Sequence, residues 1–123
     1  MNVFFDIQGT LVCGGRARPH VREVFETLTR EGHRVYLWSS GGRAYANSAA
    51  ALLGVEDLVL ECFSKSSYLP VSVDFVVDDY PDLVAMHGGH TVPFFDGDPE
   101  DDGLLAALDA VRKAAANGYS PDG

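Results

Sequence analysis

Cysteine is scarce in this sequence, which has only Cys13 and Cys62 among its 123 residues. Two cysteines do not make the disulfide framework of a small secreted domain, nor a zinc site. We therefore expect two reduced thiols in a cytoplasmic protein. The sequence also has no apolar run near the roughly 20 residues of a membrane span, and no charged leader precedes the first apolar segment. We expect neither a membrane anchor nor a secretory signal.

Positively charged residues are also few. The chain has 9 Lys and Arg against 18 Asp and Glu, a net charge of −9. Binding to nucleic acid needs a positive face, so we expect no nucleic-acid partner. Any anionic substrate must be attracted locally, by a metal ion or by specific cations. The acidic stretch from Asp96 to Asp102 is interpreted as a solvated loop and helix start.

Patterns typical of strands and helices alternate along the chain. Apolar and β-branched runs predict strands over 2–5, 34–38, 58–63, 73–77 and 91–95, and helices are predicted over 18–30, 44–53, 81–87 and 104–115. This alternation predicts a three-layer, Rossmann-like α/β fold, with a five-stranded parallel sheet and helices on both faces. One domain over residues 1–116 accounts for the chain, and residues 117–123 are expected to form a disordered tail.

Polar residues follow three of the predicted strands. Asp6 ends the first strand, Ser39 and Ser40 end the second, and Asp78 and Asp79 end the fourth. Ligands of open parallel sheets bind at the carboxyl ends of the strands, so these residues are the candidates for a site.

Each strand end has a plausible chemical role. A carboxylate such as Asp6 can attack phosphorus and form an acyl phosphate. Gly9 permits a tight turn after it, whose free N–H groups, together with the Thr10 hydroxyl, can hold a phosphate. Asp78 and Asp79 offer the hard oxygen ligands that suit Mg²⁺.

Two further elements complete the candidate site. The Ser39 and Ser40 hydroxyls, followed by glycines and a helix start, form a second anion-binding device. A cation is also needed beside the phosphate. Lys65 is one candidate and Arg43 is the competitor.

These motifs resemble those of the haloacid-dehalogenase-like superfamily. The first motif there is Asp-x-Asp-Gly-Thr after an apolar strand, and here it stands as Asp6-Ile7-Gln8-Gly9-Thr10. The second, a Thr or Ser at a strand end, matches Ser39. The third, a lysine, matches Lys65, and the fourth, an acidic pair, matches Asp78 and Asp79. The motifs occur in the family's order, and the resemblance covers roughly residues 2–113.

The resemblance implies a Mg²⁺-dependent phosphatase or phosphotransferase with a phosphoaspartyl intermediate. Asp6 would be the nucleophile and a metal ligand, and the Gln8 carbonyl and Asp78 or Asp79 would complete the protein ligands. Ser39 would bind the phosphoryl oxygens and Lys65 would offset their charge.

Position 8 departs from the family pattern. Family phosphatases usually have a second aspartate there, which protonates the leaving group and later activates water. Gln8 has an amide, which hydrogen-bonds but exchanges no proton near neutral pH. Three hypotheses follow: a leaving group of low pKa needs no acid; His20 or Tyr45 supplies the proton; or the domain binds phosphate or phosphoprotein without turnover.

No room for a cap domain is left in the sequence. Residues 12–18 and 64–72 are too few for one, so the site is expected to be open. An open site suits a phosphoprotein, another macromolecule, or a small substrate enclosed by an oligomer partner. A receiver-type signalling domain is disfavoured, because that fold places its phosphate-accepting Asp after the third strand and an acidic pair after the first.

Overall fold

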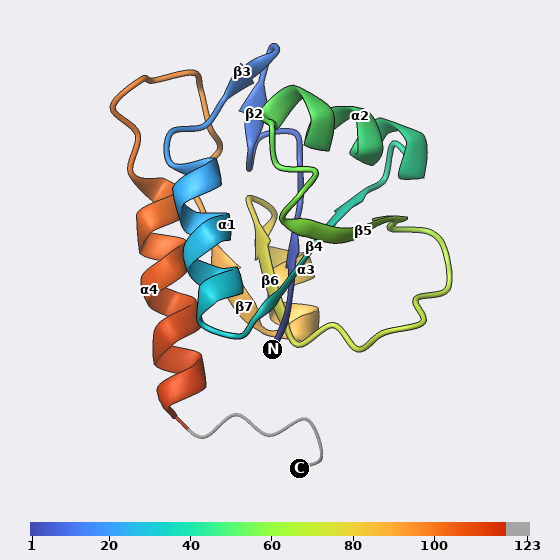
Figure 1. Ribbon diagram of the computed structural model, residues 1–123, viewed down its shortest axis with the longest axis vertical. Helices are drawn as coiled ribbons and strands as arrows, with labels where there is room; N and C mark the ends of the chain where they lie inside the picture. Colours follow the sequence, from blue (N-terminus) through green and yellow to red (C-terminus); the bar gives the residue numbers. More distant parts are fainter. Residues whose placement is uncertain (118–123) are drawn as a thin grey trace.

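The computed structural model describes residues 1–117, so the predicted tail beyond Asn117 lies outside the described residues. Its centre is a parallel five-stranded sheet (Figure 1), in the order β5-β4-β1-β6-β7. The strands are β1 (Asn2–Phe5), β4 (Arg34–Ser39), β5 (Val59–Ser64), β6 (Phe75–Asp78) and β7 (Gly89–Thr91). Every neighbouring pair runs parallel, so all five carboxyl ends face the same edge.

Helices cover both faces of the sheet, which confirms the predicted α/β class. They are α1 (Val21–Arg30), α2 (Arg43–Leu53), α3 (Pro81–His87) and α4 (Gly103–Ala116). The buried residues of α1, α2 and α4 share one core with Val3 and Phe5, and α1 and α4 lie side by side in Figure 1. Val84 of α3 packs in a second core, on the opposite face.

The second core is mainly aromatic, and α3 and one long loop cover it. Phe4, Tyr36, Trp38 and Phe63 form its centre, with the rings of Phe4 and Tyr36 stacked 4.9 Å apart. Residues 65–74, which link β5 to β6, form a long loop without a helix (yellow-green in Figure 1), and its apolar side chains pack on these rings. The short interval between Lys65 and Asp78 explains why this crossover contains no helix.

A small hairpin, which the sequence patterns did not predict, forms a two-stranded sheet of its own. It consists of β2 (Val12–Cys13) and β3 (Arg16–Ala17), joined through Gly14 and Gly15. With two residues in each strand it is far smaller than a domain, so the described chain has no cap.

Two predicted elements were misplaced. The last strand is Gly89–Thr91, not 91–95, because Pro93 has no N–H to extend the ladder, while Gly89 lies against the backbone of Val76, where a Cβ would overlap it. The first helix begins at Val21, not at residue 18. His20 has a φ of 74°, in the left-handed region, so the helical conformation cannot extend back through it.

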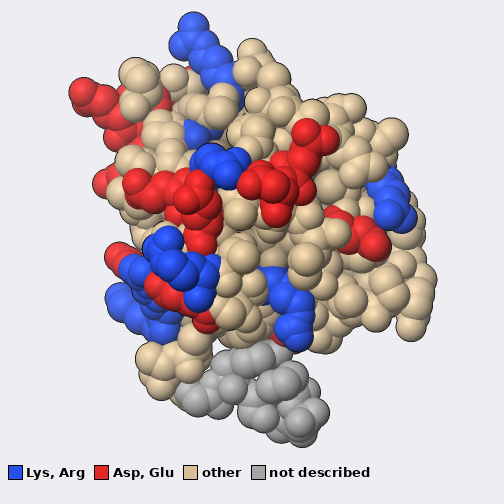
Figure 2. Space-filling model, viewed as in Figure 1, with Lys and Arg blue, Asp and Glu red and all other residues tan. Residues whose placement is uncertain are grey.

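None of the described helices has the length and apolar character needed to cross a bilayer. On the face seen in Figure 2, basic side chains are interspersed with acidic ones and form no continuous positive area.

An arginine is buried in this acidic protein. Arg18 is 1% exposed and its guanidinium makes two hydrogen bonds with Asp101, at 2.7 and 3.1 Å. A third N–H donates to the carbonyl of Thr10 at 3.2 Å, and the guanidinium carbon lies 5.5 Å from the centre of the Phe95 ring. Asp101 is therefore a structural partner, and not part of a solvated loop as predicted.

Asp101→Asn tests this ion pair. We expect the substitution to lower the free energy of unfolding by about 3 kcal/mol near neutral pH, because it leaves a buried guanidinium without its counter-charge. Asp102→Asn is the matched control, since Asp102 is exposed and makes no side-chain capping bond to α4. Urea unfolding should place the control within about 0.5 kcal/mol of the wild type. Equal losses in both variants would contradict a structural role for the pair.

The same pair has a pH dependence. The hydrogen bonds from Arg18 hold the pKa of Asp101 below its usual range. A carboxylate with a lowered pKa stabilises the folded state above its unfolded pKa of about 3.9, and this stabilisation is lost as the pH falls through the folded value. The difference in unfolding free energy between wild type and Asp101→Asn should therefore be constant above about pH 5 and shrink below about pH 4.

Candidate functional site

Three carboxylates meet at the carboxyl edge of the sheet. Asp6 follows β1, Asp78 ends β6, and Asp79 comes next. Each offers an oxygen atom, and these atoms all lie within 4.8 Å of one another. The register pairs Phe5 with Val77, which brings the residues after them to the same place in the sheet. Asp78 is 1% exposed and Asp6 is 9% exposed, so both charges stand in a largely desolvated position.

Lys65 lies between the two buried carboxylates. Its Nζ donates to Asp6 Oδ1 at 2.8 Å and to Asp78 Oδ2 at 3.0 Å. Its backbone N–H donates to the carbonyl of Ser39 at 3.0 Å, and its Nζ is 5.7 Å from the centre of the Trp38 ring. The backbone of this lysine is thus bonded to the end of β4, and its ammonium group contacts two of the three acids.

Burial and charge act in opposite directions on this pair. Burial raises the pKa of Asp6, and the hydrogen bond and charge of Lys65 offset only part of that effect. For Lys65, burial disfavours the charged form, but the hydrogen bonds and charges of Asp6 and Asp78 outweigh it and raise its pKa. Lys65 is therefore a firmly held cation at neutral pH.

The turn after β1 is held in place by its own backbone. The Ile7 carbonyl accepts hydrogen bonds from the N–H groups of Thr10, Leu11 and Val12, at 2.8–3.1 Å. The Thr10 hydroxyl lies 3.1 Å from Asp6 Oδ2 and 3.2 Å from Asp79 Oδ1, and its single proton serves one of them at a time. Thr10 thus links the nucleophile candidate to the acidic pair.

Gly9 makes a close approach that a larger residue would prevent. Its φ is 80°, and a Cβ there would lie 2.5 Å from the Phe94 ring and 3.0 Å from Asp79 Oδ2. The Gly9 carbonyl accepts the N–H of Phe95 at 2.8 Å. Both the turn and the packing therefore require glycine at this position.

Ser39, the last residue of β4, and Ser40, which follows it, differ in their surroundings. Ser39 is 6% exposed, and its Oγ accepts the N–H of Gly41 at 2.9 Å. Its own hydroxyl proton remains available to a bound anion. Ser40 is exposed. Because Ser39 and Lys65 are joined through their backbones, the predicted second and third motifs lie side by side.

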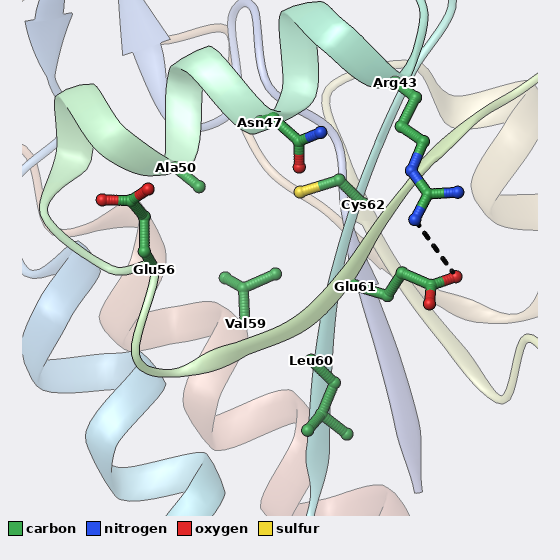
Figure 3. Close-up of a pocket in the computed structure, with 8 residues that line it drawn as sticks. All are labelled: Arg43, Asn47, Ala50, Glu56, Val59, Leu60, Glu61 and Cys62. Atoms are coloured by element: carbon green, nitrogen blue, oxygen red, sulfur yellow. Dashed lines mark ion pairs between the residues drawn. The ribbon is translucent and has the colours of Figure 1, made fainter.

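Arg43 is not at the carboxylates. Its guanidinium points toward Glu61, with Nη2 and Oε2 3.9 Å apart (Figure 3). The two residues line a separate hollow of about 360 Å³ between α2 and β5, to which none of the three acids contributes. Burial raises the pKa of the Cys62 thiol in its wall. Of the two candidate cations, the structure places Lys65 with the acids and Arg43 elsewhere.

The donor set fits a hard divalent cation. Lys65 contacts one oxygen of Asp6, which leaves Oδ2 for a metal, and Asp78 and Asp79 supply further carboxylate oxygens. Asp78 also accepts the N–H of Tyr80 on Oδ1 at 2.9 Å, so its carboxylate is held in a fixed orientation. Within residues 1–117, no backbone N–H donates to the Gln8 carbonyl, so that oxygen is free to act as a ligand.

Sequence reasoning missed two residues that shape the site. Phe94 lies over Gly9 although 58% of it is exposed. Arg18 holds the carbonyl of Thr10 from the other side. Neither residue follows a strand of the five-stranded sheet, and the contacts depend on segments far apart in the chain. No local pattern marked them.

Of the two alternative proton donors, Tyr45 lies beside the predicted anion loop. A Cβ on Gly41 would be 3.4 Å from the Tyr45 ring. The His20 imidazole instead faces Glu23, with Nδ1 and Oε2 3.5 Å apart.

Neither the comparison with protein-family models nor the comparison with curated proteins finds a match for this chain. Any functional assignment therefore rests on the motifs and on the geometry of the site.

Gly9→Ala tests the close packing of the turn. Gly32→Ala is the matched control, because Gly32 has a similar φ of 90° and no atom within 4 Å of an added Cβ. We expect the control to cost about 1 kcal/mol of stability for its backbone conformation. Gly9→Ala should cost a further 1–3 kcal/mol or so, from overpacking against Phe94. Thermal or urea unfolding gives both values, and equal losses would show that Phe94 does not restrict the turn.

Proposed function

We propose that this chain is a Mg²⁺-dependent phosphatase or phosphotransferase of the haloacid-dehalogenase-like type, with Asp6 as its phosphate-accepting nucleophile. The observation that carries the proposal is the contact of Lys65 with both Asp6 and Asp78, in a cluster completed by Asp79. A structural ion pair needs one carboxylate. Three carboxylates around one lysine leave an excess of negative charge that a divalent cation would neutralise.

The residues suit an in-line displacement at phosphorus. Asp6 Oδ attacks the phosphorus atom and the bond to the leaving oxygen breaks, which yields an acyl phosphate. Lys65 and the Ser39 hydroxyl stabilise the phosphoryl oxygens. The N–H groups from Gly9 to Val12, which the sequence suggested as phosphate donors, already donate to carbonyls within the turn and are not counted among them. A bound Mg²⁺ would offset the repulsion between the carboxylate and the phosphate. Water then attacks the acyl phosphate and releases phosphate and the Asp6 carboxylate.

Gln8 limits the reaction. General acid–base help is worth about 10²- to 10⁴-fold in rate, which corresponds to roughly 3–5 kcal/mol of transition-state stabilisation. The amide at position 8 provides no such help, although its carbonyl remains available to the metal. We therefore propose slow turnover, or turnover restricted to leaving groups that need no acid.

The second candidate is a phosphate- or phosphoprotein-binding module without turnover. Gln8 is the observation that favours it, because the groups that bind a phosphoryl group remain while the acid–base group is missing. The absence of a cap from the described residues leaves room for a macromolecular partner at the same site. Formation of an acyl phosphate on Asp6 separates the two candidates.

Phosphoryl transfer to Asp6 is directly testable. After incubation with acetyl phosphate and Mg²⁺, intact-mass and peptide mass spectrometry should find one added phosphoryl group, on the peptide that contains Asp6. Asp6→Asn should stay unmodified, and EDTA should prevent the modification. Mg²⁺ binding without an adduct, with acetyl phosphate or with BeF₃⁻, would support the binding module. Loss of both would overturn the whole assignment.

Gln8→Asp should increase turnover. The new carboxyl restores a proton donor and acceptor, so hydrolysis of p-nitrophenyl phosphate in Mg²⁺ should rise by as much as about 10²- to 10⁴-fold. Gln8→Asn is the control, because it shortens the side chain without adding a titratable group. A variant that binds Mg²⁺ but gains no activity would contradict the role assigned to position 8.

A further inference from the structure

A hollow of about 310 Å³ lies next to the candidate site, between the β2–β3 hairpin and α2. One wall is a single face of α2, since its members recur at the spacing of one helix side. The lining residues are Gln8, Val12, Gly14, Gly15, Tyr45, Ser48, Ala49 and Leu52.

Two of the lining residues connect this hollow to the candidate site, although none of the three acids lines it. Gln8 stands two residues after Asp6 and forms part of its wall. Tyr45, on the other side, packs against Gly41, where a Cβ would lie 3.4 Å from its ring and 3.3 Å from Ser39 Oγ. The hollow is thus flanked by the turn after β1 and by the turn after β4. These are the two turns to which the proposed function assigns the phosphoryl group.

The lining is uncharged in a chain whose net charge is −9. Val12, Ala49, Leu52 and the Tyr45 ring present apolar surface, and Leu52 is 61% exposed. The polar side-chain groups of the lining are the Gln8 amide and the hydroxyls of Ser48 and Tyr45. The volume is at the lower end of the roughly 300–1,000 Å³ typical of small-molecule pockets, a size that suits one ring.

We propose that this hollow holds the leaving group of the substrate, and that the substrate is a phosphate monoester of a small, uncharged, ring-containing alcohol of the phenol class. The inference rests on the proposed function. When Asp6 attacks phosphorus, the bond to the phenol oxygen breaks, and that oxygen leaves with the electron pair and takes a proton from water. A phenol has a pKa of about 10, so it departs without the acid that Gln8 cannot provide.

A matched pair of leucines tests the subsite in the full chain. Leu52 and Leu60 are each 61% exposed, but Leu52 lines this hollow and Leu60 lines the separate one between α2 and β5. The measured quantity is kcat/KM for phenyl phosphate divided by kcat/KM for acetyl phosphate, which has no ring. We expect Leu52→Asp to lower this ratio at least tenfold, and Leu60→Asp to keep the wild-type ratio.

A second pair of variants distinguishes an effect on the subsite from an effect on folding. Ser48 and Asn47 are neighbours on α2 and line different hollows. Ser48→Trp should fill the subsite and lower the same ratio at least tenfold, whereas Asn47→Trp should leave it unchanged. Binding gives an independent readout: by calorimetry, phenylphosphonate should bind Ser48→Trp at least tenfold more weakly than Asn47→Trp, while methylphosphonate binds both equally.

The possible results distinguish a failure of the subsite proposal from a failure of the proposed phosphatase function. If phenyl phosphate is hydrolysed and Asp6 is phosphorylated, but the Leu52 and Ser48 variants behave as their controls do, the subsite is wrong and the phosphatase stands. If no phosphate ester is turned over and Asp6 forms no adduct, both fall together. A wild-type enzyme that hydrolyses glycerol phosphate as well as phenyl phosphate would also overturn the preference for a ring.

Discussion

Asp6 and Asp78 stand at the ends of neighbouring parallel strands, and their negative charges would repel each other if nothing lay between them. Lys65 removes this repulsion by donating to both. Its ammonium is offset by two carboxylates, and Asp79 adds a third acid to the cluster. The remaining negative charge at this edge is the basis of the proposed Mg²⁺ site, since carboxylate oxygens are the ligands that this ion prefers. Position and charge together make this edge of the sheet the candidate functional site.

A rigid frame surrounds these charges. The turn after β1 is closed by bonds to the Ile7 carbonyl, and its outer side is held by Phe95 and by the buried Arg18. Arg18 is in turn paired with Asp101, at the start of α4. Such support fixes the nucleophile candidate before any substrate arrives, and fixed geometry is what positioning and electrostatic stabilisation require. A buried arginine outside the acidic cluster thus supports the turn that holds Thr10 beside the acids.

Much of the fold followed from patterns in the chain. Short apolar runs and helical spacing predicted the five strands and four helices, and a parallel sheet brings its strand ends together whatever the side chains are. The errors arose where one residue altered the backbone: His20 stops the first helix, and Pro93 ends the last strand early. The hairpin was missed because two-residue strands are too short to show a period. The direction of Arg43, the alternative cation, could not be predicted either, since a long side chain turns toward its partner, here Glu61.

The sequence by itself determined which groups are available: a carboxylate after the first strand, an acidic pair after the fourth, a lysine between them, and an amide at position 8. These identities follow from short motifs, because a strand and its following turn are local. Only the tertiary structure decided that Lys65 contacts two acids, that Arg18 pairs with Asp101, and that Gln8 borders an uncharged hollow. Each of these depends on residues brought together by packing across the sheet, and local spacing carries no information about such distances.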